Sequence, residues 1–173
     1  MTRTVPVSRQ IAVAVGLLAV VAVIAVGGSF ATMGNVEGWY ADVDKVPWNP
    51  PGAVFGPAWS ILYLLIALAG FLLWRSGRVR EEDDGLGRVL AGFYIVQLML
   101  NALWTPLFFA AYPLIGEVAW WLAMIDIVAL IAIVMVLIAL AARRSQAAAL
   151  LLVPYLLWLV FAATLNAGII ALN

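Results

Sequence analysis

The chain contains no cysteine and no histidine among its 173 residues, and only 10% of them are charged. The lack of cysteine excludes disulfides, thiolate-held clusters and thiol chemistry. The lack of histidine removes the commonest metal and haem ligand and the usual general base, so we expect no metal site, no bound cofactor and no conventional catalytic constellation. Nine basic residues balance nine acidic ones without a basic cluster beside aromatic residues. Nothing therefore points to nucleic-acid binding.

Apolar residues dominate instead: 66% of the chain is hydrophobic, and the mean hydropathy is +1.11. This balance is far from that of a soluble domain. Five apolar runs are long enough to cross a hydrocarbon core, at roughly 11–30, 54–74, 89–110, 118–142 and 147–172. They lack the alternation of barrel strands, and backbone groups in lipid must be satisfied internally, so each run is expected to be a helix. The prediction is an all-α integral membrane protein, with residues 1–173 forming a single five-helix domain.

The first apolar run follows Arg3 and Arg9, a pattern that secretory signal peptides also show. The run is longer than the usual apolar core of a signal peptide, so we expect it to be the first membrane helix.

Basic residues are distributed unevenly among the connectors. Eight arginines lie in the N-terminal tail and in the connectors after the second and fourth runs, whereas the other side has only Lys45. The eight are Arg3, Arg9, Arg75, Arg78, Arg80, Arg88, Arg143 and Arg144. The positive-inside rule then predicts a bacterial-type cell membrane protein with a cytoplasmic N-terminus and an external C-terminus. The acidic residues 81–84 weigh little in this rule and are expected to form a solvated turn.

The connector between the first two runs, residues 33–53, is rich in tryptophan and proline. It contains Trp39, Tyr40 and Trp48, with prolines at positions 47, 50 and 51. Proline fixes φ and removes a backbone donor. We therefore expect a stiff, ordered loop that presents flat rings at the membrane surface.

Three of the runs carry aromatic and polar residues at helical spacing. The three stripes are Phe55, Trp59 and Tyr63; Gln97, Asn101, Trp104 and Phe108; and Tyr155, Trp158, Ala162 and Asn166. A period of 3.6 residues places the members of each stripe on one face of its helix. Three such faces can hardly all point to lipid.

Two interpretations of these stripes are open. In the first, the amides hydrogen-bond neighbouring helices and the aromatic residues form interfacial belts. In the second, which we favour because belt aromatics should not share an inward stripe with amides, the stripes line a pocket for a flat apolar ligand. Asn101, Trp104 and Trp158 would then donate hydrogen bonds to it. The small side chain of Ala162 would leave room for a ligand, although it also suits close helix packing.

Asp126 is the only acid far from the ends of any apolar run. Charge at such a depth is costly, so one interpretation is functional: a proton site, or a partner for a polar group inside the bundle. The alternative is a structural acid that holds its helix to its neighbours. No lysine or arginine lies within a run to pair with it, which favours the structural interpretation.

Rare residues recur in a fixed order along the chain. They are Trp39-Tyr40, Lys45-x-Pro47-Trp48-x-Pro50-Pro51, Trp59 with Tyr63, Gln97-x-x-x-Asn101-x-x-Trp104, Phe108-Phe109, Pro154-Tyr155-x-x-Trp158 and Leu165-Asn166. In this order and spacing they resemble the TspO/MBR family, the tryptophan-rich sensory proteins whose mitochondrial members are called translocator protein or peripheral benzodiazepine receptor. The resemblance covers about residues 35–173.

The resemblance implies a ligand and a site. Family members bind tetrapyrroles such as protoporphyrin IX under the first loop, and mitochondrial members also bind cholesterol and benzodiazepine-type drugs. With Phe55 added from its stripe, the predicted binding residues are Trp39, Tyr40, Pro50, Phe55, Trp59, Tyr63, Asn101, Trp104, Trp158 and Ala162. The cholesterol-associated pattern expects a basic residue soon after Tyr155, and none is present, so the sequence gives sterol binding little support.

Three functions stay open at this point. The first is a receptor or transporter for porphyrins, acting in tetrapyrrole traffic or stress sensing. The second, implied by some bacterial relatives, is light-dependent degradation of protoporphyrin, with Trp39 and Trp158 as the catalytic indoles. The third is a scaffold or regulator that contacts membrane partners through the charged connector 76–88. The resemblance also implies a homodimer, and small residues such as Gly92, Ala163 and Ala167 would allow close helix contact.

Overall fold

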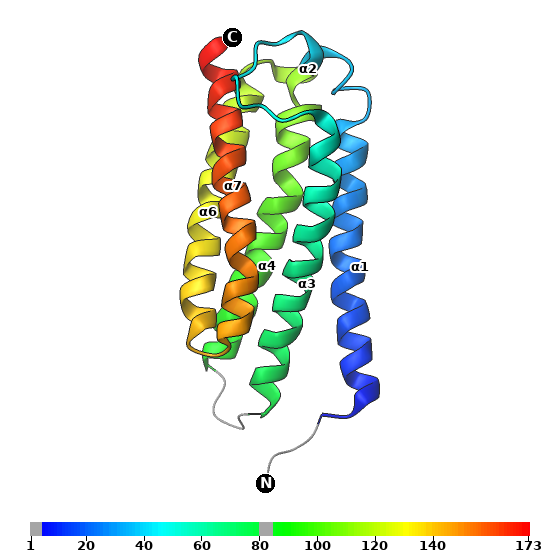
Figure 1. Cartoon of the computed structure of the whole chain (residues 1–173), viewed down its shortest axis with the longest axis vertical. Coiled ribbons are helices and arrows are strands. Elements are labelled where there is room, and N and C mark those ends of the chain that lie inside the picture. Colours follow the sequence, from blue (N-terminus) through cyan, green and yellow to red (C-terminus); the bar gives the residue numbers. More distant parts are fainter. Residues whose placement is uncertain (1–4, 80–84) are drawn as a thin grey trace.

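The computed structural model describes residues 5–79 and 85–173. Five long helices run along the molecule (Figure 1): α1 (Val7–Thr32), α3 (Phe55–Val79), α4 (Gly85–Thr105), α6 (Val118–Ala142) and α7 (Gln146–Leu172). All five, α4 together with the turns that continue it, are long and apolar enough to cross a membrane. The predicted all-α membrane fold with five spans is confirmed.

The five helices form a closed ring. In order around the bundle they are α1, α3, α7, α6 and α4, and α4 returns to α1. Helix α1 has the loosest position, because Val21 is its only buried residue, whereas α6 and α7 each bury nine or more residues. The packing core therefore lies among α3, α4, α6 and α7, and α1 covers one side of it.

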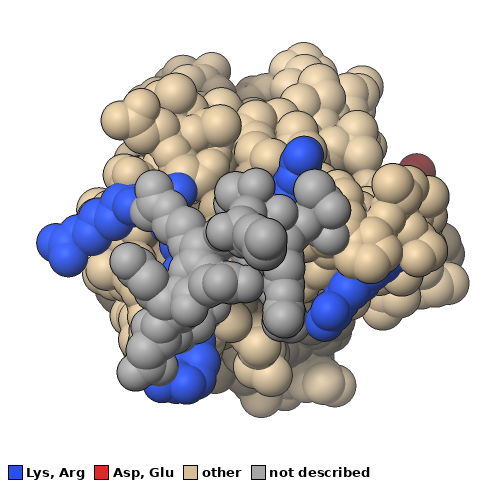
Figure 2. Space-filling view, turned by 90° about the horizontal axis from the view of Figure 1, so that it is seen from below, with Lys and Arg blue, Asp and Glu red and all other residues tan. Residues whose placement is uncertain are grey.

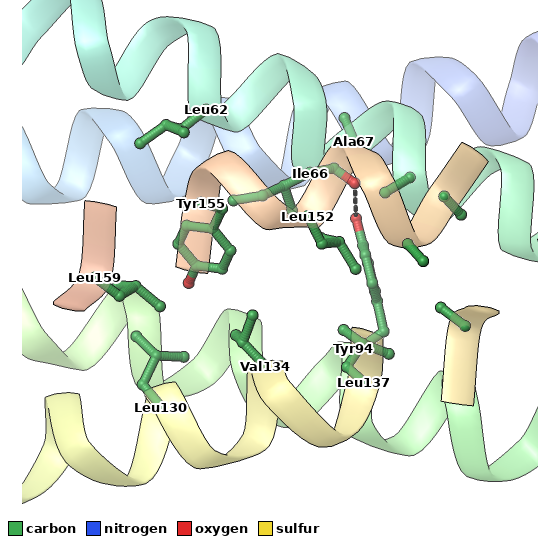
Figure 3. Close-up of a cluster of buried hydrophobic side chains, with 14 of the residues drawn as sticks. Leu62, Ile66, Ala67, Tyr94, Leu130, Val134, Leu137, Leu152, Tyr155 and Leu159 are labelled. Atoms are coloured by element: carbon green, nitrogen blue, oxygen red, sulfur yellow. Dashed lines mark hydrogen bonds between the residues drawn. The ribbon is translucent and has the colours of Figure 1, made fainter. Parts of the chain in front are cut away.

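The centre of the core is made of aliphatic side chains around two tyrosines (Figure 3). Leu130 and Val134 of α6 lie near Leu159 and Tyr155 of α7, and the Tyr94 hydroxyl of α4 donates a 2.9 Å hydrogen bond to the Ile66 carbonyl of α3. The Tyr94 hydroxyl thereby has a hydrogen-bond partner, which neither lipid nor the apolar side chains around it could provide.

Glycine allows α3 and α4 to approach each other at the same place. A Cβ on Gly70 would lie only 2.5 Å from the end of the Tyr94 ring, so the position requires a residue without a side chain. The Tyr94 hydrogen bond and the gap at Gly70 together fix the contact between α3 and α4.

The observed spans agree with the predicted runs in number and order, and α6 has the predicted bounds. The other spans are longer, counting α4 together with the π-helix that follows it, because residues at their ends continue the helix beyond the hydrocarbon-length run. Helix α1 begins at Val7 rather than Ile11, and α3 continues to Val79 rather than ending at Trp74. A helix can continue past the hydrocarbon core into the interface between lipid and water, because polar side chains such as that of Arg75 can reach water there.

The third run changes its winding before it ends. After α4, a π-helix, η2 (Pro106–Ala110), continues the chain, followed by the single turn α5 (Tyr112–Ile115). Pro106 has no N–H to donate, which interrupts the regular i→i−4 ladder, and Ala111 N donates to the Pro106 carbonyl instead, at 2.9 Å. Such π turns occur frequently at functional sites.

The tryptophan- and proline-rich connector lies over one end of the bundle, beside the last turns of α7 (Figure 1). It contains the single turn α2 (Trp39–Asp42) and the 3-10 turn η1 (Gly52–Val54). Gly34, with φ of 78°, makes the bend after α1, in a backbone region that favours glycine.

The two ends of the bundle differ in charge. Arginine side chains are distributed around the end where α1 begins (Figure 2), and the described ones are Arg9, Arg75, Arg88, Arg143 and Arg144. The connector end carries Lys45 together with Glu37, Asp42, Asp44 and Glu117. Arg3, Arg80 and the predicted solvated turn 81–84, part of the predicted contact surface 76–88, lie outside the described residues. The orientation in the membrane stays a prediction.

Candidate ligand-binding cavity

A cavity of about 820 Å³ lies beneath the connector, between the upper halves of α1, α3, α4 and α7. Its volume falls in the upper part of the range of about 300–1,000 Å³ that is typical of ligand pockets. Eight of the ten predicted binding residues line it: Tyr40, Pro50, Phe55, Trp59, Tyr63, Trp104, Trp158 and Ala162. The structure thus brings together residues that lie more than 120 positions apart in the sequence.

One aromatic group comes from α3 and α7. The Trp158 ring meets Phe55 edge to face at 5.9 Å and Trp59 edge to face at 6.5 Å, and Trp59 lies 5.3 Å from Tyr63. Such edge contacts hold the rings in fixed orientations and leave π faces available. We call this set, Phe55, Trp59, Tyr63 and Trp158, the α3–α7 wall.

A second aromatic group comes from α4 and the π-helix. Trp104 stacks on Phe108 with a centroid distance of 5.4 Å and an interplanar angle of 16°, and Phe109 lies edge to face against Phe108 at 4.9 Å. All three residues line the cavity. Phe108 and Phe109 are neighbours in sequence, and both belong to the π-helix.

The connector contributes the third side. Tyr40, Lys45, Asn49 and Pro50 line the cavity. The Tyr40 hydroxyl donates to Asn49 Oδ1 at 3.2 Å, and Lys45 Nζ lies 4.8 Å from the centroid of the Tyr40 ring. Burial raises the pKa of the Tyr40 hydroxyl, and the weaker effect of the Asn49 hydrogen bond lowers it. The hydroxyl therefore stays protonated at neutral pH.

Asn101 does not line the cavity, although we predicted it as a donor to the ligand. Its Oδ1 accepts a 3.0 Å hydrogen bond from the Tyr63 hydroxyl, and its Nδ2 donates to the Tyr155 hydroxyl at 3.0 Å. This network joins α3, α4 and α7 directly behind Tyr63. For Asn101, the structure therefore agrees with the interpretation of an interhelical hydrogen-bonding group.

Trp39 does not line the cavity either. Its ring packs 4.2 Å from Tyr112, and its Nε1 donates to the Phe109 carbonyl at 3.2 Å. It lies in an aromatic cluster with Phe108 and Trp120, behind the cavity wall. Of the two indoles predicted for porphyrin degradation, only Trp158 faces the cavity.

Three buried polar atoms on cavity-lining residues have no hydrogen-bond partner among the described residues. They are Trp104 Nε1, Trp158 Nε1 and Asn166 Oδ1. The other side of the Asn166 amide is used, since its Nδ2 donates to the Trp120 carbonyl at 3.4 Å. A buried polar atom without a partner costs about 1–3 kcal/mol, so a ligand group that reached one of these atoms would offset that cost.

Gln97 and Asp126 are two further buried polar residues of the bundle. Gln97 is fully buried on α4, and neither atom of its amide has a partner within the described residues. Asp126 is 6% exposed on α6, and its Oδ2 also has none. Neither residue lines the cavity. The stripe pattern correctly predicted that Gln97 lies inside the bundle. Gln97 does not reach the cavity because it lies about two helical turns before Trp104, the first cavity-lining residue of α4.

Helix α1 supplies lining residues that the sequence analysis missed. Ala25, Gly28, Ser29 and Thr32 face the cavity. These side chains are small, so they contribute to the cavity by leaving space for it. No aromatic or charged residue in this part of the sequence indicates that α1 lines a cavity. The cluster of small residues at 27–29 was the only available indication. Lys45 was also missed as a lining residue, although it was part of the family motif.

Comparison with known proteins identifies the family. The model of the TspO/MBR family matches residues 15–172, which include most of α1 and all of the other spans. The chain belongs to the TspO/MBR family. The resemblance based on the tryptophan and proline motifs is confirmed.

Relatives of this TspO/MBR protein come from archaea, bacteria and mammals. The tryptophan-rich protein TspO of Archaeoglobus fulgidus is 41% identical over 157 residues, which are 89% of this chain and 94% of that protein. The translocator protein of Sus scrofa is 37% identical over 80% of this chain and 79% of its own. The tryptophan-rich sensory protein of Cereibacter sphaeroides is 36% identical over 84% and 85%.

Proposed function

We propose that this TspO/MBR protein is a membrane receptor that binds a porphyrin-type tetrapyrrole in the cavity under the connector, in tetrapyrrole traffic or stress sensing. The observation that carries the proposal is the cavity itself: two aromatic groups around about 820 Å³, with two unpaired indole N–H groups on their rings. Flat π faces suit a planar macrocycle, and the indoles suit polar atoms at its edge.

Binding is favoured over catalysis by the position of the two indoles. A degradation reaction that uses Trp39 and Trp158 together needs both beside the ligand, and Trp39 lies behind Phe108 and Phe109 with its N–H already bonded.

We further propose that the connector end faces the outside and that the protein forms a homodimer, as the sequence analysis predicted.

The test is a titration of the detergent-purified protein with protoporphyrin IX in the dark, followed by the porphyrin absorption band and by tryptophan quenching. Saturable binding is expected for the natural chain. Ala162→Phe should weaken it by about tenfold or more, because Ala162 is buried on the cavity wall and a phenyl group there would occupy ligand space.

Ala171→Phe is the matched control, since Ala171 is exposed on the same helix and lies outside the cavity lining. It should bind as the natural chain does, and both variants should elute as folded protein. Unchanged binding by Ala162→Phe would place the site elsewhere, and absence of saturable binding in the natural chain would contradict the proposal.

A further inference from the structure

A chain of hydrogen bonds leads from the cavity wall into the centre of the bundle. Tyr63 lines the cavity, and its hydroxyl donates to Asn101 Oδ1 at 3.0 Å. Asn101 Nδ2 in turn donates to the Tyr155 hydroxyl oxygen at 3.0 Å. Both donors therefore point away from the cavity. The chain reaches Tyr155 with one hydrogen still available, that of the Tyr155 hydroxyl.

This last hydroxyl lies deep in the core. Tyr155 is fully buried, and no described residue accepts a hydrogen bond from it. Figure 3 shows its hydroxyl at the end of the ring that points toward α6, near Leu130 and Leu159. The large majority of buried polar groups in proteins have a partner, because a buried donor without an acceptor is costly. We therefore expect an acceptor on the α6 side of Tyr155.

Asp126 supplies a carboxyl on this side. It lies one turn before Leu130 on α6, and residues at i and i+4 share a face of a helix. The Asp126 carboxyl is close enough to the Tyr155 hydroxyl for an electrostatic interaction between the two groups. No hydrogen bond joins them directly, and Asp126 Oδ2 has no partner within the described residues. Two buried polar groups at such a separation are suited to a bridging water.

A purely structural Asp126 would also be buried on α6. In that case its side chain only fills space between helices, and an apolar side chain of similar size would serve as well. The cost of burying a carboxyl at this depth argues for more, because a polar partner offsets that cost and an apolar neighbour does not. The two roles differ in one measurable respect, since only the second couples Asp126 to Tyr155.

We infer that α6 and α7 bind a water molecule between the Tyr155 hydroxyl and the Asp126 carboxyl. The water accepts a hydrogen bond from Tyr155 and donates one to Asp126, so the chain runs without a break from the cavity wall to the carboxyl. Asp126 is then a positioning residue for Tyr63, which it supports from behind through Tyr155 and Asn101. This water site lies outside the cavity and does not depend on which ligand the cavity binds.

Asp126→Leu and Tyr155→Phe, alone and combined, test the coupling. The measurement is the apparent unfolding temperature in dodecyl maltoside, followed by circular dichroism. Each single change leaves the other group without its partner, whereas the double change removes both polar groups. The double variant should therefore unfold at least about 2 °C above the temperature obtained by adding the two single losses. Asp126→Asn keeps a carbonyl oxygen as acceptor and should retain most of the stability that Asp126→Leu loses.

Tyr94→Phe is the matched control. Its hydroxyl is also buried, but it donates to the Ile66 carbonyl and takes no part in the chain. Its loss and that of Asp126→Leu should simply add. Additive losses for Tyr155→Phe and Asp126→Leu would overturn the inference in favour of the structural role, and so would equal stability of Asp126→Asn and Asp126→Leu.

A crystal structure of the natural chain, at a resolution that shows ordered water, tests the site without any variant. One water within about 3.2 Å of both the Tyr155 hydroxyl oxygen and an Asp126 carboxyl oxygen is the expected result. Well-ordered density with no water between the two groups, or with a direct hydrogen bond between them, would overturn the inference.

Discussion

Asn101 and Trp158 were predicted from the same kind of helical stripe, but their side chains have different hydrogen-bond partners in the structure. Both were expected to donate to a ligand from the inward face of a helix. The oxygen and the nitrogen of the Asn101 amide are each hydrogen-bonded to a phenol, whereas the Trp158 indole N–H is buried on a cavity-lining residue without a described partner. Helical spacing identifies the inward face of a helix but not the side chains that meet it. The partners of Asn101 come from two other helices, which spacing within one helix cannot specify.

Trp158→Phe tests the use of the unpaired indole. The change removes the N–H and part of the ring, so we expect protoporphyrin IX affinity to fall by about 1–3 kcal/mol, read from the porphyrin absorption band. Trp120→Phe is the matched control, because the Trp120 Nε1 is also buried without a described partner but lies outside the cavity. Equal affinities for all three proteins would mean that the Trp158 indole is part of the core only.

At the scale of elements, the number and order of the membrane-spanning helices were predictable from the sequence, because they depend on composition over many residues. Five apolar runs give five spans because the hydrocarbon core sets their length. The π-helix Pro106–Ala110 and the turns α2 and α5 were not predicted, since each depends on a few backbone hydrogen bonds at a helix end. The part of the cavity wall formed by Gly28 and its small neighbours was not predicted either. Small residues leave a cavity only where α1 packs against the other helices, and this packing cannot be inferred from the sequence of α1 alone.

The connector is fastened to the last turns of α7. Trp48 Nε1 donates to Thr164 Oγ1 at 3.3 Å, and the Asn173 side chain both accepts from Asp44 N at 2.9 Å and donates to the Asp44 carbonyl at 3.1 Å. Between these contacts, the Val46 side chain fills the place that a Cβ on Gly168 would occupy. Helix α7 therefore positions the loop that covers the cavity.

Gly168→Ala should loosen this connector. The added methyl group would overlap Val46, and overpacking of this kind costs about 1–3 kcal/mol. Opening of the loop exposes the bond after Lys45 to trypsin, so cleavage there should accelerate by about tenfold when opening is fast relative to cleavage. The fragment that ends at Lys45 can be followed by mass spectrometry.

Two further variants separate a specific clash from a general loss of stability. Ala171→Val adds volume at an exposed position less than one helical turn after Gly168 and should leave the cleavage rate unchanged. Val46→Ala combined with Gly168→Ala should restore much of the resistance, because the shortened side chain makes room for the methyl group. Cleavage of Gly168→Ala at the rate of the natural chain would show that the connector does not depend on α7.

At the scale of the whole molecule, the charge distribution relates the cavity to the membrane. The described arginines lie at one end of the bundle and the cavity lies at the other, beneath the connector (Figures 1 and 2). If the arginine-rich end faces the cytoplasm, as the positive-inside rule predicts, a ligand reaches the cavity from the outer side of the membrane. The orientation thus decides from which compartment the proposed receptor samples its ligand.

The absence of cysteine makes this orientation measurable without background labelling. Glu117→Cys introduces a thiol at an exposed position on the cavity side, and Gln146→Cys introduces one at an exposed position beside Arg143 and Arg144. Acidic residues contribute little to topology, so loss of Glu117 should not change it. In intact bacterial cells, a membrane-impermeant maleimide should label Glu117→Cys at once and Gln146→Cys only after lysis. Labelling of Gln146→Cys in intact cells would show that the chain is inserted the other way or in both orientations, and the cavity would then receive its ligand from the cytoplasm.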